Sequence, residues 1–135
     1  MRAIHFFLLF TLSALMLSSC KKNQDGSLPG NEAPLAFVIE PDPGSSVVPS
    51  LSVAYTYKKK ITSQLPAGGV SLDLSTRVEA TDELTHAQNL SSSVATLVAS
   101  TGDLTPGVLY KVIVKVTSKD QSTNSATKQF LVARK

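Results

Sequence analysis

The feature that most constrains the fold is an alternation of apolar and polar side chains with a period of two. In "VSLDLSTRVE", residues 70–79, the side chains of Val70, Leu72 and Leu74 fall on one face and the intervening polar side chains on the other. The segment "YKVIVKVTS", residues 110–118, repeats this alternation. A period of two is typical of a strand with one buried face, whereas an amphipathic helix repeats every 3.6 residues. The pattern therefore predicts a β-sheet that covers a core.

Five further segments have strand composition, and each is separated from the next by a stretch rich in Gly, Pro, Asn, Asp or Ser. Together they predict an all-β, antiparallel β-sandwich of about seven strands. The segment 84–89, "LTHAQN", has low β propensity, so we expect it at a sheet edge. The five segments are Leu35–Ile39, Leu51–Tyr57, Leu84–Asn89, Val94–Ala99 and Ala126–Ala133.

The turn before the sixth predicted strand, "LTPGVLYKVIV", carries a more specific signal. Leu104, Pro106, Gly107 and Tyr110 resemble the tyrosine corner of fibronectin type III and related immunoglobulin-like domains. The resemblance implies a structural role for Leu104, Pro106 and Tyr110, in which the tyrosine hydroxyl bonds a backbone group a few residues upstream. Bacterial polycystic-kidney-disease-type domains have a similar segment, so the subfamily stays open.

The chain lacks tryptophan. An immunoglobulin-like domain usually buries one on an early strand. We expect three aromatic residues to take its place: Phe37, Tyr55 and Tyr57.

The first nineteen residues have the three parts of a secretory signal peptide. Arg2 gives a positive start, an apolar run extends from about Ile4 to Leu17, and small residues follow. This run is shorter than the roughly 20 residues that a transmembrane helix needs. Residues 1–19 are therefore predicted to be a cleaved signal peptide.

Leu17, Ser18, Ser19 and Cys20 resemble the lipobox of bacterial lipoproteins. The resemblance implies cleavage before Cys20, lipid attachment to its thiol and acylation of the new amino terminus. The alternatives are an ordinary signal peptide with an unrelated cysteine, and an uncleaved anchor. Because Cys20 is the only cysteine, its lipidation would leave the chain without a disulfide.

The segment after the lipobox predicts a flexible tether and bears on the membrane in which the protein is located. Residues 20–34 comprise the lipidated cysteine and a flexible linker, and residues 35–135 form the folded domain. Lys21 stands where an aspartate marks inner-membrane retention in enteric lipoproteins, so the outer membrane is favoured. Bacteroidota-like surface lipoproteins carry an acidic cluster at this place, where this chain has only Asp25. The face of the membrane therefore stays open.

Lys58, Lys59 and Lys60 are expected to form a basic loop that faces the membrane; the alternative is that they only keep the loop soluble. Lys119 and Asp120 are expected at the same end of the sandwich. The net charge of +3 is not concentrated in a basic, aromatic-rich patch. Nucleic acid is therefore not an expected partner. Acidic residues predicted at the far end raise a weaker calcium hypothesis: Asp42, Asp82, Glu83 and Asp103.

The sequence predicts no catalytic residue, cofactor or metal site. His86 is the only histidine after the signal peptide, and no G-x-S-x-G or phosphate-binding motif is present. We expect His86 to be a surface residue. The predicted function is a lipid-anchored, non-catalytic interaction module for another envelope protein or a glycan. The alternatives are a structural spacer without a ligand and an enzyme with an unfamiliar active site.

Overall fold

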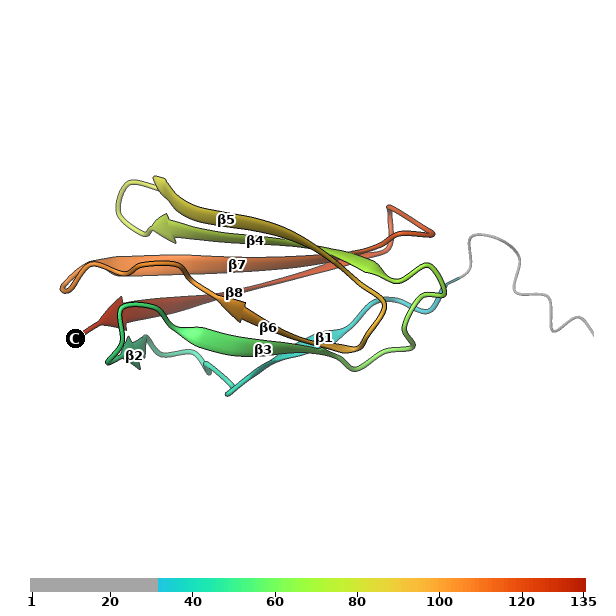
Figure 1. Ribbon diagram of the computed structural model, residues 1–135, viewed down its shortest axis with the longest axis horizontal. Coiled ribbons are helices and arrows are strands. Elements are labelled where there is room, and N and C mark those ends of the chain that lie inside the picture. The colour runs from blue at the N-terminus through green and yellow to red at the C-terminus, as the bar shows by residue number, and fades with distance from the viewer. Residues whose placement is uncertain (1–31) are drawn as a thin grey trace, which may run out of the picture.

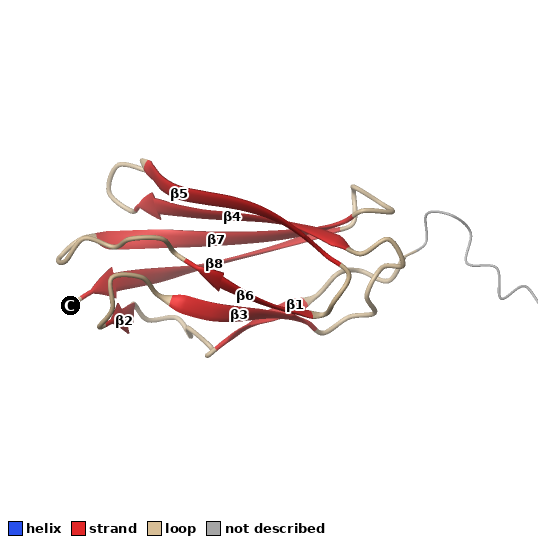
Figure 2. Cartoon of the chain, in the orientation of Figure 1, coloured by secondary structure: helices blue, strands red, loops and turns tan. Residues whose placement is uncertain are grey.

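The structure is a computed structural model that describes residues 32–135. The predictions for the signal peptide, Cys20 and the tether up to residue 31 lie outside these residues. The described part is all-β, with strands and loops and no helix (Figure 2). Its eight strands are β1 (Phe37–Glu40), β2 (Val48–Ser50), β3 (Thr56–Ile61), β4 (Val70–Val78), β5 (Leu84–Ser92), β6 (Thr96–Ser100), β7 (Leu109–Ser118) and β8 (Ser125–Arg134).

The strands form two sheets that face each other as the layers of a β-sandwich (Figure 1). One sheet has the order β1-β3-β6 and the other the order β2-β8-β7-β4-β5. All neighbouring strands are antiparallel except β2 and β8, which are parallel. Because β1 and β2 belong to different sheets, the chain crosses from one layer to the other between Glu40 and Val48.

The predicted alternation places the core between the layers. Leu72 and Leu74 of β4 lie opposite Val116 and Val114 of β7, and all four side chains are buried. Phe130 of β8 lies under the facing sheet, with its ring centroid 5.3 Å from that of Tyr57. Burial of each such apolar side chain contributes about 1.5–3 kcal/mol. The core therefore consists of the inward faces that the period of two predicted.

Two strand predictions differ from the structure. The sequence predicts seven strands and misses β2, which has three residues and contains Pro49. This short strand depends on its pairing with Val132–Arg134, more than eighty residues away. The predicted strand Leu51–Tyr57 is also wrong at its start, because residues 51–54 form a bend and Leu51 is 86% exposed.

The two ends of the sandwich carry most of the loops expected there. Lys119 and Asp120 lie in the β7–β8 loop, at the end where residue 32 enters (Figure 1). The β4–β5 and β6–β7 loops, with their acidic residues, lie at the opposite end. Asp42 is an exception to the prediction, because it lies on the crossover between the two sheets.

Candidate interaction site

Tyr110 holds the loop that precedes β7. Its hydroxyl oxygen accepts a hydrogen bond from the backbone amide of Thr105, at 3.1 Å. Leu104 and Tyr110 are buried, and the Arg134 guanidinium donates to the carbonyl oxygen of Leu104 at 3.2 Å. Pro106 forms an isolated β-bridge with Arg134 and is exposed. These contacts give the Leu104–Tyr110 segment a structural role.

The predicted basic loop of Lys58, Lys59 and Lys60 is wrong, because all three residues lie within β3. Lys58 and Lys60 are exposed, whereas Lys59 points into the core and is fully buried. β3 is the central strand of its sheet, and Lys59 lies between Ile39 of β1 and Leu97 of β6. Such a position is nearly always apolar, so the sequence suggested that the strand had already ended.

The Lys59 amine is unusual in its surroundings. Among residues 32–135, its Nζ atom has no hydrogen-bond partner. Burial lowers the pKa of this amine, because an apolar environment disfavours the charged form. The long aliphatic stem contributes to packing between the layers. Lys59 is therefore a core residue that cannot contact a membrane.

The acidic residues expected at the far end do not converge on one point. The Asp82 carboxylate contacts Arg77 Nη1 at 3.4 Å and Lys111 Nζ at 3.1 Å, so it is already paired with cations. The Asp82 carboxylate raises the pKa of Lys111, first through their side-chain hydrogen bond, and Glu79 adds to this effect. Within residues 32–135 no three His, Cys, Asp or Glu side chains gather to hold a metal ion.

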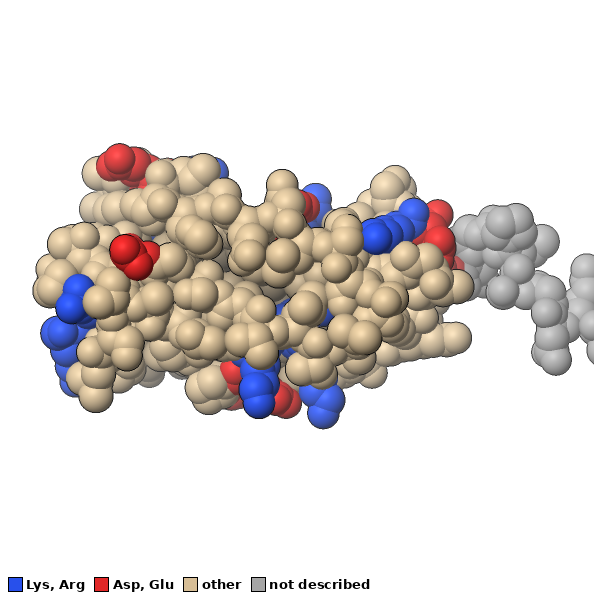
Figure 3. Space-filling view, in the orientation of Figure 1, with Lys and Arg blue, Asp and Glu red and all other residues tan. Residues whose placement is uncertain are grey.

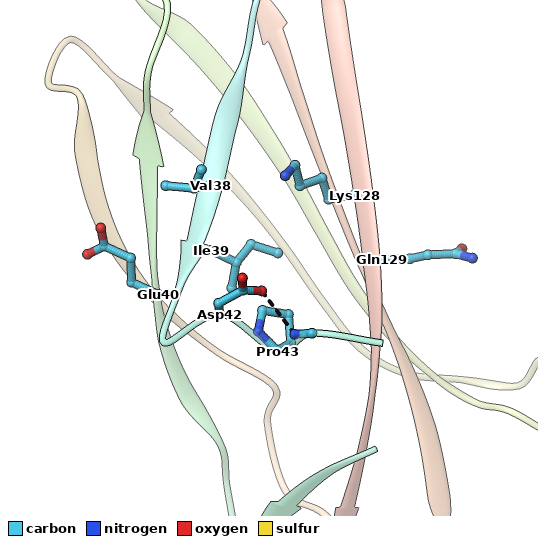
Figure 4. A pocket seen from close by; sticks show the side chains of 8 residues that line it. Val38, Ile39, Glu40, Asp42, Pro43, Lys128 and Gln129 are labelled. Atoms are coloured by element: carbon cyan, nitrogen blue, oxygen red, sulfur yellow. Dashed lines mark hydrogen bonds between the residues drawn. The ribbon is translucent and has the colours of Figure 1, made fainter. Parts of the chain in front are cut away.

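Asp42 lines a shallow groove of about 460 Å³ between β1 and β8, beside the sheet crossover. In Figure 4 the Lys128 side chain points from β8 towards β1, whereas Gln129 points away. The Lys128 amine lies 5.9 Å from the centre of the Phe37 ring. Lys128 belongs to the part of β8 that β2 leaves unpaired. An inward-pointing charge at a free edge hinders the addition of another strand.

β5 presents a different kind of edge. It is the last strand of the five-stranded sheet, and β4 is its only neighbour in the described part of the chain. Its nine residues, "LTHAQNLSS", include no charged residue and no proline, and six of them are exposed. Figure 3 shows a mostly uncharged surface across the middle of this face of the molecule. β5 therefore lacks charge and proline as edge protections, and its one irregularity is the register shift against β4 beside Thr85, at the start of the strand.

The inner side of β5 packs against the β6–β7 loop. His86 was expected at the surface, but it is only partly exposed and lies beside Gly102. Gly102 has a φ of +73°, and a Cβ atom there would come within 2.7 Å of the His86 ring. Glycine is therefore required at this position. The loop supports β5 from within the sandwich, while the free edge points outward.

The aromatic side chains of residues 32–135 all pack in or against the core. The rings of Tyr55 and Tyr57 are stacked with their centroids 6.2 Å apart, and both contact Phe130 edge-on. The two tyrosines and Phe37 thus occupy the interior position expected of them. No aromatic ring remains in this part of the chain as an exposed platform for stacking on a ligand.

Asn124 fixes the point where the chain enters the sandwich. Its side-chain oxygen accepts a hydrogen bond from the Leu35 amide at 2.9 Å. Its amide nitrogen donates to Glu32 Oε2 at 2.9 Å and to the carbonyl oxygen of Ala33 at 3.0 Å. The end of the predicted flexible tether, residues 32–34, is therefore attached to the β7–β8 loop.

Comparison with known proteins adds no relative. No family model matches the chain, and no curated protein aligns with it significantly. Residues 32–135 include no helix that is long and apolar enough to cross a membrane.

Proposed function

We propose that this chain is a lipid-anchored lipoprotein of a bacterial envelope, and that its sandwich is an immunoglobulin-like domain of the fibronectin type III kind that binds another envelope protein. The anchor is Cys20, and the outer membrane is the favoured location. Support for the domain type comes from the Tyr110–Thr105 hydrogen bond and from the division of the strands into β1-β3-β6 and a second sheet that ends in β4-β5.

The observation that carries the binding role is the free edge of β5. A nine-residue edge offers a row of backbone N–H and C=O groups to an extended partner segment. Natural edge strands are usually protected by charge, proline, a bulge or shortness. β5 has neither a charged residue nor a proline, and its register with β4 shifts only beside Thr85, so that residues 86–92 form a regular open edge. An edge kept accessible in this way is suited to pairing with a partner strand.

The buried aromatic residues favour a protein over a glycan as the partner. Exposed aromatic rings supply much of the contact energy at many binding surfaces, and sugar rings stack on them. Residues 32–135 expose no such ring. A strand edge binds through backbone hydrogen bonds instead, which suits a polypeptide. The spacer alternative is favoured by the same absence, because a spacer needs no binding surface.

Photo-crosslinking in intact cells tests the binding role. A photoreactive amino acid in place of Asn89 would lie at an exposed position of β5. The same group in place of Thr127 would lie at an exposed position of β8, away from the free edge of β5. We expect specific protein adducts from position 89 and few from position 127. Absence of adducts at position 89 would favour the spacer.

Mass spectrometry of the purified native protein tests the anchor independently. We expect a chain that begins at Cys20 and carries acyl groups. An unmodified thiol at Cys20, or retention of residues 1–19, would overturn the proposed anchoring.

A further inference from the structure

We propose that the partner at β5 is a second copy of this chain, and that two copies pair their β5 strands antiparallel around Gln88. The pairing would join two five-stranded sheets into one continuous sheet. This inference rests on the proposed binding role of the β5 edge and names its occupant.

The length of the edge selects β5 among the free edges of the described sandwich. β5 has nine residues, of which the seven residues 86–92 are in continuous register with β4, whereas the free edges of β1, β2 and β6 have four, three and five residues. The uncovered part of β8 carries the inward-pointing Lys128. Because each ladder adds hydrogen bonds in proportion to its length, β5 provides the most extensive pairing.

The residues of β5 are compatible with self-pairing about a two-fold axis. With Gln88 opposite its own copy, the regular residues 86–90 of the two strands lie opposite one another, and the irregular Thr85 falls toward the end of the ladder, opposite Ser91. His86 then faces Leu90 on the inner side, and Ala87 faces Asn89 on the outer side. Residues that face one another in an antiparallel ladder contact directly, and like charges there destabilise the pair. Since β5 has no charged residue, no such repulsion arises within the ladder.

In this register the charged residues next to β5 do not lie opposite one another either. Asp82 and Glu83 precede the strand, and their counterparts across the axis are Val94 and Ser93. The acidic residues of one copy therefore lie beside uncharged residues of the other. In a two-fold symmetric dimer the same surface patch of each copy forms the interface. The patch must therefore be free of repulsion against its own copy.

The antiparallel arrangement sets the orientation of the dimer at the membrane. It places the two points of chain entry, at Glu32, at opposite ends of the joined sheet. The eleven residues between Cys20 and Glu32 extend to about 40 Å at most. Both anchors can then reach one leaflet when the strands lie along the membrane surface. Attachment to a common leaflet also raises the effective concentration of the two copies.

Disulfide trapping in cells tests the pairing at its centre. Residues directly opposite in an antiparallel ladder have Cα atoms about 4.5–5.5 Å apart, within the range that a disulfide bridges. We expect Gln88→Cys to form a covalent homodimer under mild oxidation. Two controls should form none: the parent chain, whose only cysteine is Cys20, and Thr127→Cys on exposed β8.

A mixed experiment tests the register. Ala87→Cys in one copy and Asn89→Cys in the other should yield a heterodimer when the two variants are expressed together. Each variant alone should yield little, because its two thiols would be displaced by two residues along the strand, about 7 Å. Homodimers from either variant alone, without the heterodimer, would overturn the register.

A charge introduced at the two-fold axis tests whether the uncharged ladder permits self-pairing. Gln88→Lys would place two ammonium groups opposite each other, and we expect the dimer fraction of the full chain in detergent to fall at least tenfold. Gln88→Thr, which suits a strand and carries no charge, should retain the dimer. Equal dimer fractions for the two variants would contradict pairing at β5.

The crosslinks separate failure of this inference from failure of the proposed function. Adducts at position 89 with a different protein, without a Gln88→Cys homodimer, would overturn the second copy as partner and leave β5 as a binding edge. Absence of adducts at position 89, together with absence of the Gln88→Cys homodimer, would overturn both the second copy as partner and the role of β5 as a binding edge.

Discussion

The hydroxyl oxygen of Tyr110 accepts a hydrogen bond from the backbone amide of Thr105, five residues earlier in the chain, at a distance of 3.1 Å. This bond connects the start of β7 to the loop that leads into it. Tyr57 provides a contrast, because its buried hydroxyl has no hydrogen-bond partner within residues 32–135. The contribution of the Thr105 bond to the free energy of unfolding can therefore be measured by comparing a Tyr→Phe change at position 110 with the same change at position 57.

We predict that Tyr110→Phe lowers the free energy of unfolding by about 0.5–1.5 kcal/mol, because it removes the acceptor of the Thr105 amide, which is exposed enough for water to take its place. Tyr57→Phe removes a hydroxyl that bonds nothing in the described structure, so its effect should be small or stabilising. Urea denaturation of both variants measures the difference. A loss for Tyr57→Phe as large as that for Tyr110→Phe would contradict a specific role for the Thr105 bond.

We predict that Lys59→Met raises the free energy of unfolding by about 1–3 kcal/mol, because it removes from the core a polar group that has no partner among residues 32–135, while keeping a long, flexible side chain. Lys60→Met is the matched control, since Lys60 is exposed on the same strand. Denaturant unfolding near pH 7 checks both variants. A destabilised Lys59→Met protein would show that the amine has a stabilising contact.

The stability of the parent chain should also depend on pH through Lys59. Burial lowers the pKa of Lys59 below 10.5, so the unfolded chain holds a proton that the folded chain has released between the lowered pKa and 10.5. The free energy of unfolding should therefore receive a contribution from Lys59 that rises with pH through this window and then levels off. In Lys59→Met this rise should disappear, which denaturant titrations at several pH values would detect.

Tyr57 should give the opposite dependence at higher pH. Burial raises the pKa of Tyr57 to about 12, against 10.0 for an unperturbed tyrosine. The unfolded chain then loses this proton first, and the free energy of unfolding should fall by about 3 kcal/mol between these two pH values. Comparison of the parent with Tyr57→Phe isolates this contribution. Equal alkaline losses in the two proteins would exclude Tyr57 as the cause.

We predict that Asn124→Ala releases the chain entry from the β7–β8 loop. The substitution removes the acceptor of the Leu35 amide and both donors to Glu32 and Ala33. Hydrogen exchange at the Leu35 amide should become at least tenfold faster. Thr123→Ala, an exposed change in the same loop, should leave this exchange rate unaltered. Unchanged exchange in Asn124→Ala would mean that other contacts hold this segment.

The strongest sequence predictions were those that depend on a regular pattern. The alternation in residues 70–78 and 110–118 predicted two central strands and their buried faces correctly, because burial on one face requires apolar residues at every second position. The expectation that residues 84–89 form an edge strand was also confirmed. A segment with low β propensity and polar side chains on both faces suits an edge strand and not a central one.

The candidate site was less accessible to sequence reasoning. The Lys58–Lys60 prediction failed because three consecutive lysines resemble a solvated loop, although Tyr57, Lys59 and Ile61 continue the period of two. The free edge of β5 becomes evident only when its neighbours are known. Whether a strand is central or at an edge depends on pairing between segments that are far apart in the chain.

By itself, the sequence determined that the folded part, residues 32–135, is all-β and which faces of its main strands are buried, because a local pattern of period two is sufficient for both. The tertiary structure decided that Lys59 lies inside, that β2 pairs with β8, and that β5 has no second neighbour among residues 32–135. These features depend on long-range pairing and packing. The free energy of such contacts belongs to two distant segments together, so neither segment reveals it alone.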